Sequence, residues 1–314
     1  MTNRKIYVCH TLYHLLICLY KEEIYSNLEI ILSSSIPDVD NLEKKLKSKT
    51  INIHILEESS GESEELLSVL KDAGLSYSKF DSNCFIFNDA TPIGRTLIKH
   101  GIYYNLIEDG LNCFTYSIFS QKLWKYYVKK YILHKIQPHG FSRYCLGIEV
   151  NSLVNLPKDP RYKKFIEVPR KELFDNVTEY QKEMAINLFG AVRVSIKSPS
   201  VLVLMQPLSI DKEFMSYNNK IETSEEQFNF YKSIVNEYIN KGYNVYLKVH
   251  PRDRDVVDYS KLPVELLPSN VPMEIIELML TGRFECGITH SSTALDFLTC
   301  VDKKITLVDL KDIK

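Results

Sequence analysis

The sequence predicts an α/β protein of two facing Rossmann-like domains, each built on a parallel sheet. Three observations support this prediction. The length of 314 residues exceeds what one hydrophobic core usually supports and suggests about two domains. Short apolar runs alternate with helical stretches, which is typical of parallel strands covered by helices. This alternation stops in a middle segment punctuated by proline and starts again after residue 199.

The first half of the chain contains short apolar runs that predict buried strands. The segments that separate or follow these runs predict helices. The expected strands cover 6–9, 28–32, 51–56, 84–87 and 103–107. The expected helices cover 12–20, 41–47, 62–73 and 93–100. Strands that alternate with helices in this way predict a mostly parallel sheet with helices on both faces.

The middle of the chain is irregular, because it contains Pro138, Pro157, Pro160 and Pro169. Helices are expected at 121–136 and 179–189. We place a domain boundary between residues 192 and 193, which gives one domain at 1–192 and a second at 193–314.

The second half restarts the alternation of strands and helices. The expected strands cover 201–205, 243–249, 286–289 and 305–308, and the expected helices cover 224–241, 273–280 and 294–298. Ser224 and Gln227 fit a capping box at the start of the first of these helices, and Gly242 ends it.

The composition excludes several classes of protein. Lys and Arg number 39 against 40 Asp and Glu, so the net charge of −1 gives no overall attraction to nucleic acid or anionic lipid. A hydrophobic content of 45% argues against disorder. The 7 scattered cysteines form no Cys/His cluster, which predicts a reducing compartment and no metal site. Without a recognisable signal peptide or a run of about 18 apolar residues, we expect a cytoplasmic protein.

Ligands of open parallel sheets bind at the carboxyl ends of the strands, which marks the loops after residues 107, 205, 249 and 289. The loop after residue 249 begins with His250-Pro251-Arg252. Pro251 fixes the turn, the imidazole can donate a hydrogen bond or a proton, and Arg252 can neutralise charge, as a leaving phosphate requires. The alternative is a histidine that only caps the strand, and we favour the functional interpretation.

The loop after residue 289 carries three consecutive hydroxyl residues, Ser291, Ser292 and Thr293. Hydroxyl and backbone N–H groups at a helix N-terminus can hold a phosphate without a glycine-rich loop. Such a loop is unexpected here, because the chain has only 11 glycines. The alternative is an ordinary N-cap serine.

Acidic residues follow other strands. Glu108-Asp109-Gly110 ends a strand, and Gly110 permits a tight turn that exposes an acid able to remove a proton from a hydroxyl. Asp211 lies in the loop after residue 205, and Glu274 lies in a helix where its carboxylate can bind a ribose diol. The alternatives are an ordinary Asp-Gly turn, a turn or N-cap aspartate, and a solvated helix face.

Taken in order, these motifs resemble those of the bacterial sialyltransferases: an acidic-acidic-Gly turn, then His-Pro, then paired hydroxyls. Here they are Glu108-Asp109-Gly110, His250-Pro251 and Ser291-Ser292. The sequence is most similar to glycosyltransferase family 52, which includes lipooligosaccharide and streptococcal capsule sialyltransferases. Cys9-His10-Thr11 and Ser209-Ile210-Asp211-Lys212-Glu213 extend the resemblance. It runs from Ile6 to near Leu310, but no residue is carried over from 137–199.

The resemblance implies a GT-B glycosyltransferase with an acceptor-side domain at 1–192 and a donor-binding domain at 193–314. It implies transfer of sialic acid from CMP-sialic acid to a terminal galactose-type hydroxyl of a capsular or surface oligosaccharide, with inversion and without metal or cofactor. The partners are then CMP-sialic acid and an oligosaccharide acceptor, free or lipid-linked, and not nucleic acid. The linkage, the acceptor sugar and a homodimeric state stay open.

The resemblance also gives the candidate residues roles. His250 hydrogen-bonds or protonates the CMP phosphate, and Glu274 binds the ribose. Asp211 and Asp109 compete as the base for the acceptor hydroxyl. We favour Asp211 because it matches the nearer relatives, with Asp109 as an orienting residue or as the base itself. The other expected substrate-binding residues are His10, Thr11, Glu108, Gly110, Pro251, Arg252, Ser291, Ser292 and Thr293.

Two alternative functions are retained. One is a GT-B transferase that uses another nucleotide sugar, in which case uridine nucleotides compete better than CMP. The other is a non-catalytic sugar- or nucleotide-binding protein, in which case His250→Ala changes affinity at most.

A basic and aromatic segment at 121–132 bears on localisation. Lys122, Lys125 and Lys129 fall at helical spacing, so a helix here can rest on anionic lipid at the inner face of the membrane, where a lipid-linked acceptor lies. The alternative, which we favour from sequence, is a solvated helix whose Tyr and Ile side chains pack on the core.

Overall fold

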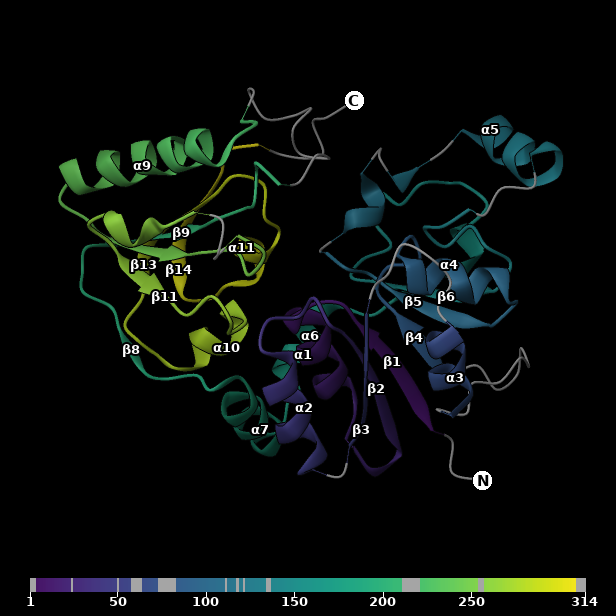
Figure 1. Cartoon of the computed structure of the whole chain (residues 1–314). Helices are drawn as coiled ribbons and strands as arrows, with labels where there is room; N and C mark the ends of the chain where they lie inside the picture. The colour runs from purple at the N-terminus through teal and green to yellow at the C-terminus, as the bar shows by residue number, and fades with distance from the viewer. Residues whose placement is uncertain are drawn as a thin grey trace. The chain divides into compact units, whose positions relative to one another are not determined.

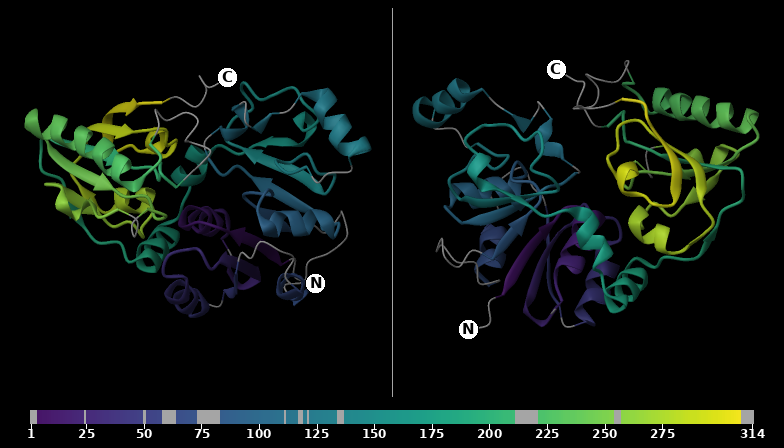
Figure 2. Two further views of the ribbon diagram at one scale, coloured as in Figure 1. Left: turned by 45° about the horizontal axis from the view of Figure 1, so that its top comes forward. Right: turned by 180° about the vertical axis from the view of Figure 1, so that it is seen from behind.

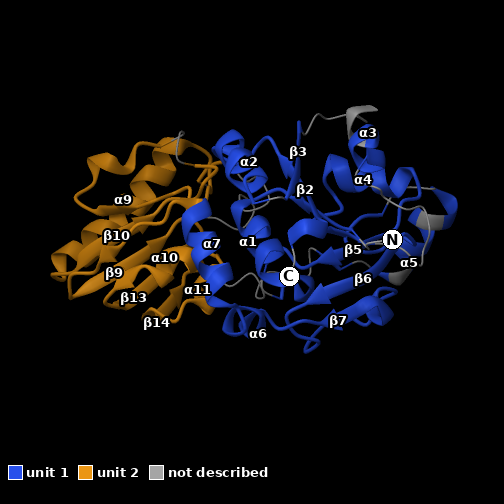
Figure 3. Cartoon of the chain, turned by 90° about the horizontal axis from the view of Figure 1, so that it is seen from below, with its two compact units in different colours: residues 1–188 blue, residues 189–314 orange. Residues whose placement is uncertain are grey.

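The computed structural model describes residues 4–23, 25–49, 51–57, 64–72, 83–110, 112–116, 119–120, 122–133, 137–210, 221–253 and 257–308. The chain divides into two compact units, residues 1–188 and 189–314, which are coloured blue and orange in Figure 3. The assignment of one half to the acceptor and the other to the donor stays a prediction.

Unit 1 contains a seven-stranded parallel sheet in the order β3-β2-β1-β4-β5-β6-β7 (Figure 1). β2 is buried at every position, as expected for a strand in a sheet covered on both faces. The strands are β1 (Lys5–Cys9), β2 (Leu28–Ser33), β3 (Asn52–Leu56), β4 (Cys84–Ile86), β5 (Tyr104–Ile107), β6 (Cys145–Val150) and β7 (Phe165–Glu167).

The helices of unit 1 connect these parallel strands. α1 (Leu12–Lys21) follows β1 and is mostly buried. The others are α2 (Val39–Lys47), α3 (Glu64–Asp72), α4 (Pro92–Lys99), α5 (Leu123–Tyr127), α6 (Arg170–Asp175) and α7 (Glu179–Phe189). Short 3₁₀ turns occur at η1 (Tyr25–Asn27), η3 (Cys113–Thr115) and η6 (Tyr162–Lys164), and a π-helical turn at η5 (Val128–Ile132).

Unit 2 is built on a five-stranded parallel sheet in the order β11-β10-β9-β13-β14. Its strands are β9 (Ser200–Leu204), β10 (Asn244–Lys248), β11 (Glu265–Leu267), β13 (Phe284–Thr289) and β14 (Val301–Thr306). A separate pair joins β8 (Val194–Ser195) to β12 (Leu280–Thr281). The helices are α9 (Ser224–Asn240), α10 (Met273–Leu278) and α11 (Ala294–Phe297), with a 3₁₀ turn at η7 (Tyr259–Lys261). The long helix α9, green in Figure 2, runs along one face of the sheet.

The two parallel sheets confirm the predicted α/β class, but several elements differ from the prediction. β6 and β7 lie in the middle segment, where no strand was expected. In the described part of the helix expected at 121–136, α5 is followed by the π-helical turn η5, and residues 121 and 134–136 lie outside the described residues. The last strand lies at Val301–Thr306 rather than at 305–308, because it pairs with β13 from Phe284 onward.

The start of α9 also corrects a prediction. Its N-cap is Thr223, whose side chain accepts the N–H of Glu226, and the Glu226 carboxylate accepts backbone N–H groups in return. The capping box is therefore one residue earlier than Ser224 and Gln227, which leaves Gln227 buried. Of the helices that the structure describes, none is both long enough and apolar enough to cross a membrane.

Candidate functional site

A histidine from α1 and an aspartate from the loop after β5 form a close pair in unit 1. Nε2 of His14 lies 2.5 Å from Oδ1 of Asp109. Both residues follow strands that end at the same edge of the parallel sheet, so the fold brings them together. The side chain of His14 is 1% exposed, whereas that of Asp109 is 46% exposed. The pair therefore presents a carboxylate to solvent with a buried imidazole behind it.

Local contacts fix the orientation and protonation of His14. The backbone N–H of His10 donates to Nδ1 of His14 at 3.1 Å. In the neutral imidazole the proton is therefore on Nε2, which donates to Asp109. The ring also stacks on Phe87, with centroids 4.0 Å apart. Burial lowers the pKa of His14, and Asp109 opposes this only in part. His14 is thus a neutral donor at pH 7.

A buried arginine from α6 supports the turn that carries Asp109. Nη2 of Arg170 donates to the backbone carbonyl of Glu108 at 3.0 Å. Oε2 of Glu108 accepts the N–H of Asn151 at 2.8 Å, and Oδ1 of Asn151 accepts the N–H of Arg170 at 2.9 Å. Burial raises the pKa of Glu108, although the charge of Arg170 acts in the opposite direction. Glu108 and Arg170 thus form a buried hydrogen-bonded support beneath the turn.

The sequence-predicted residues of unit 1 differ in their exposure to solvent. Asp109 is exposed, with Gly110 beside it, whereas Glu108 is buried beneath the turn. Oγ1 of Thr11 accepts the N–H of His14 at 3.1 Å and so caps α1. The predicted substrate contacts of Glu108, Gly110, His10 and Thr11 stay predictions.

Sequence reasoning did not select His14 or Arg170. His14 looks like one more residue on the buried face of an apolar helix. Arg170 lies in the segment from which no residue was carried over. No local signal marks either residue, and His10 lies before the N-cap residue Thr11, so its spacing from His14 is not a helical one.

In unit 2, His250 follows β10 as predicted and lies in a tight turn. Its Nδ1 accepts the N–H of Arg252 at 3.2 Å, so the neutral ring carries its proton on Nε2. Burial, together with the charges of Arg252 and Lys248, lowers the pKa of His250 to about 3. At pH 7 His250 is therefore a neutral hydrogen-bond donor. It becomes a proton donor only when a nearby anion offsets this shift.

A buried glutamine joins the loops after β9 and β10. Oε1 of Gln227 accepts the N–H of Ser209 at 2.8 Å. Its Nε2 donates to Oδ2 of Asp253 at 2.6 Å and to the hydroxyl of Tyr259 at 2.7 Å. Burial raises the pKa of Asp253. This network, which sequence reasoning missed, fixes the loop that precedes Asp211 relative to the His250 turn.

Lys248 and Glu274 influence each other near the end of β10. Lys248 is buried, and its Nζ donates to the carbonyl of Pro268 at 2.6 Å. Burial lowers its pKa to about 7, with the carboxylate of Glu274 opposing this. Burial likewise raises the pKa of Glu274, and Lys248 opposes that shift. Glu274 is thus a half-buried carboxyl group in the first turn of α10, compatible with a polar ligand.

The predicted hydroxyl cluster lies between β13 and α11. Oγ of Ser291 is 3.0 Å from Nδ1 of His290. Oγ of Ser292 accepts the N–H of Ala294 at 3.3 Å, so its own O–H can donate to a ligand. α11 spans only Ala294–Phe297, however, so the hydroxyl groups rather than a long helix must supply any attraction for phosphate. The short helix expected at 294–298 is present as α11, and the phosphate cradle at its start stays a prediction.

The other acid predicted as a base, Asp211, lies outside the described residues, as do Lys212 and Glu213. The preceding residues, Ser209 and Ile210, are described. The structure thus gives a geometry for only one of the two competing aspartates.

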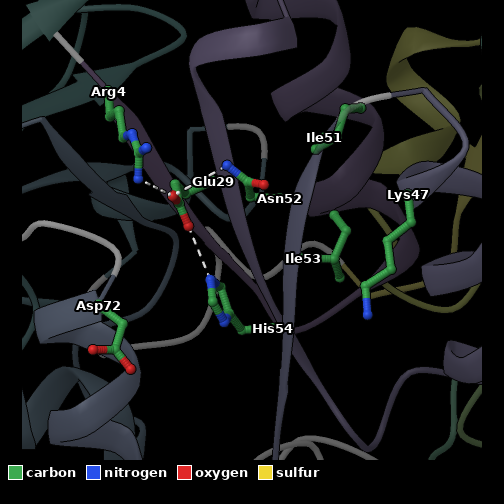
Figure 4. Close-up of a pocket in the computed structure, with 8 residues that line it drawn as sticks. All are labelled: Arg4, Glu29, Lys47, Ile51, Asn52, Ile53, His54 and Asp72. Carbon is green, nitrogen blue, oxygen red and sulfur yellow. Dashed lines mark hydrogen bonds and ion pairs between the residues drawn. The ribbon is translucent and has the colours of Figure 1, made fainter. Parts of the chain in front are cut away.

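A separate pocket of about 630 Å³ lies at the other end of the unit 1 sheet (Figure 4). Buried Glu29 accepts hydrogen bonds from Arg4 at 2.9 Å, from Asn52 at 3.3 Å and from His54 at 2.9 Å. Arg4 precedes β1 and Asn52 begins β3, so this pocket is at the amino ends of the strands. It is distinct from the carboxyl ends that carry His14 and Asp109.

Comparison with protein families now decides the class of this chain. The model of glycosyltransferase family 52 matches residues 26–312. The chain belongs to glycosyltransferase family 52. It is therefore a glycosyltransferase, and its two Rossmann-like sheets are those of the GT-B class. This confirms the family suggested by the sequence motifs, and the family implies an enzyme of the sialyltransferase type.

Solved structures give more distant likenesses. A glycosyltransferase of kitacinnamycin is 10% identical, with a TM-score of 0.43 over 100% of this chain and 88% of that one. The calicheamicin glycosyltransferase is 11% identical, with a TM-score of 0.41 over 94% of this chain and 76% of that one. The ADP-heptose lipopolysaccharide heptosyltransferase II of E. coli is 12% identical, with a TM-score of 0.34 over 93% and 80%. Comparison with curated protein sequences gave no match.

Proposed function

We propose that this family 52 enzyme transfers sialic acid from CMP-sialic acid to a galactose-type hydroxyl of a capsular or surface oligosaccharide, at the cytoplasmic face of the membrane. The observation that carries the proposal is the His14–Asp109 pair in a chain of this family. A carboxylate that is exposed to solvent and held by a neutral donor is suited to receive the proton of a sugar hydroxyl.

The proposed reaction is a single displacement with inversion. The acceptor oxygen forms a bond to the anomeric carbon of sialic acid while the bond from that carbon to the CMP phosphate oxygen breaks. The electron pair of the broken bond leaves with CMP, and the acceptor proton passes to Asp109. His14 orients the Asp109 carboxylate and stays neutral throughout.

Asp109 is preferred here over Asp211, which the resemblance alone favoured. The reason is physical: one oxygen of Asp109 is occupied by His14, and the exposed carboxylate stands on a turn anchored by Arg170. A base that is oriented in advance loses less conformational freedom when the acceptor binds. Asp211 then contributes to donor binding.

The leaving group is assigned to unit 2. His250 donates a hydrogen bond from Nε2 to the CMP phosphate, and the negative charge that develops on this phosphate as its bond to sialic acid breaks raises the low pKa of His250. Ser291 and Ser292 donate to the same phosphate, with Pro251, Arg252 and Thr293 beside it. Glu274 accepts hydrogen bonds from the ribose hydroxyls. No step requires a metal ion or cofactor, so EDTA should leave the rate unchanged.

The test is incubation with CMP-sialic acid and a panel of galactose-terminated oligosaccharides, with measurement of CMP release and of the product. We expect sialylated product that depends on the acceptor, and stronger competition by CMP than by uridine nucleotides. The alternative nucleotide-sugar transferase predicts the reverse order of competition. Absence of turnover with every acceptor would refute the proposal.

A further inference from the structure

The segment 122–133 of unit 1, which we call the α5 segment, exposes large apolar side chains. Trp124, Tyr127, Tyr131, Ile132 and Leu133 are each between 50 and 70% exposed. Such a concentration within ten residues is unusual, because contiguous exposed apolar surface on a folded protein commonly marks an interaction site. The sequence-based preference for aromatic side chains packed on the core is therefore wrong for these residues.

Among the described residues, Tyr126 packs the α5 segment against the rest of unit 1. Tyr126 is buried, with its ring 5.5 Å from that of Phe141. Nε2 of Gln137 donates to the backbone carbonyl of Tyr126 at 3.3 Å. On the outer side, the rings of Tyr127 and Tyr131 stack with centroids 6.1 Å apart. The exposed aromatic surface is thus ordered by local contacts, and Figure 1 shows α5 at the periphery of the unit.

The charge around this surface is one-sided. Between Gly110 and Ile148 the sequence contains no Asp or Glu. The basic residues of this stretch are Lys122, Lys125, Lys129, Lys130, Lys135 and Arg143. Within the α5 segment, Lys122, Lys125 and Lys129 are exposed, and Nζ of Lys125 lies 5.7 Å from the ring centroid of Trp124. A chain with a net charge of −1 therefore concentrates positive charge beside its exposed aromatic residues.

We propose that the α5 segment binds the surface of an anionic lipid bilayer. Trp and Tyr favour the boundary between headgroups and acyl chains, where the ring is in an apolar layer and the polar atom stays hydrated. Lysines beside them attract acidic headgroups, each by about fivefold in affinity. An acidic protein surface would match the charge equally well but would not require so many exposed aromatic and aliphatic side chains. The inference does not depend on the identity of the transferred sugar.

Vesicle flotation of the full chain tests the proposal. The probes are vesicles of pure phosphatidylcholine and vesicles of phosphatidylcholine and phosphatidylglycerol in equal parts. We expect flotation with the anionic vesicles only, weakened by high salt. The triple variant Lys122→Gln/Lys125→Gln/Lys129→Gln should bind on the order of a hundredfold more weakly. Trp124→Ser/Ile132→Ser should lose binding even at low salt.

Matched control variants test whether loss of binding is specific to the α5 segment or follows from removing any exposed lysine or aromatic residue. Lys158→Gln/Lys163→Gln removes exposed charge elsewhere in unit 1, and Tyr180→Ser removes a similarly exposed tyrosine from α7. Both should float like the unaltered protein. The thermal unfolding of every variant is recorded, and only variants that unfold like the unaltered protein are compared. The proposal is overturned if the unaltered protein does not float with anionic vesicles, or if the controls lose as much binding as the α5 variants. It is also overturned if light scattering shows that Trp124→Ser/Ile132→Ser converts a dimer to a monomer without changing flotation.

Discussion

Nε2 of His14 lies 2.5 Å from Oδ1 of Asp109, and the imidazole is buried while the carboxylate is exposed. The pair therefore differs from a surface ion pair, in which both groups are solvated and the contribution to stability is small. Because burial keeps His14 neutral, the contact is a hydrogen bond from imidazole to carboxylate. It orients the carboxylate without cancelling its charge, which is what a base requires.

Replacement of His14 should separate its orienting role from packing. His14→Gln keeps an N–H donor, whereas His14→Leu keeps only bulk. We expect kcat to fall about tenfold to hundredfold in His14→Leu, the range for loss of a hydrogen bond to a charged group. The loss in His14→Gln should be smaller, with KM for CMP-sialic acid unchanged in both. Equal losses in the two variants, in parallel with lowered thermal stability, would instead indicate packing alone.

Arg170 should stabilise the turn that carries Asp109. Arg170→Met removes the donor to the Glu108 carbonyl and leaves Glu108 buried without an opposing charge, so we expect about 2 kcal/mol less stability to urea and a lower kcat. Arg161→Met is the control, because Arg161 is also buried in unit 1 but pairs with Asp159. The control should lose stability without a selective loss of kcat in the protein that remains folded. If both variants lower kcat alike, Arg170 has no special connection to the site.

The pKa of His250 predicts how stability depends on pH. The unfolded chain protonates this group below its ordinary pKa near 6.5, but the folded chain does so only near 3. Between these values the unfolded state binds more protons, so this group lowers the free energy of unfolding by up to about 1.4 kcal/mol per pH unit as the pH falls. His250→Asn should show a shallower decline in urea titrations over this window. An unchanged slope would show that His250 is not held neutral.

Gln227 should couple stability to donor binding. Gln227→Leu removes the hydrogen bonds that join Ser209, Asp253 and Tyr259, and it leaves Asp253 buried without its amide donor. We expect about 3 kcal/mol less stability and weaker CMP binding by calorimetry, because both donor-side loops lose a common support. A second variant at the same position, Gln227→Glu, should be even less stable at neutral pH, since it places a second carboxyl group against Asp253. Normal CMP affinity in folded Gln227→Leu would contradict a role in the donor site.

Much of the fold could be predicted from sequence, because apolar runs such as those of β1, β2, β9 and β10 are continuous when strands are buried on both faces. β6 was missed because prolines dominate the surrounding segment, although Cys145–Val150 is itself mostly buried. The capping box was displaced by one residue because Thr223 and Ser224 are chemically equivalent in sequence, and only the backbone shows which of them begins the helix.

The candidate site was predictable only where a motif follows a strand. Asp109, His250 and Ser292, whose roles stay predictions, were selected in that way. His14 and Arg170 were not, because their importance lies in contacts with residues far away in the chain, and nothing local distinguishes them from core residues. The same holds for Gln227, whose partners come from three separate loops or turns.

The central claim is that transfer of sialic acid depends on the carboxylate of Asp109. The most direct test compares kcat for CMP-sialic acid with a galactose-terminated acceptor in the unaltered enzyme, in Asp109→Asn and in Asp211→Asn. The account predicts a loss of about 10²–10⁴-fold in Asp109→Asn with CMP affinity retained, and a smaller loss of kcat in Asp211→Asn. Near-normal transfer by Asp109→Asn, with transfer abolished in Asp211→Asn, would contradict it.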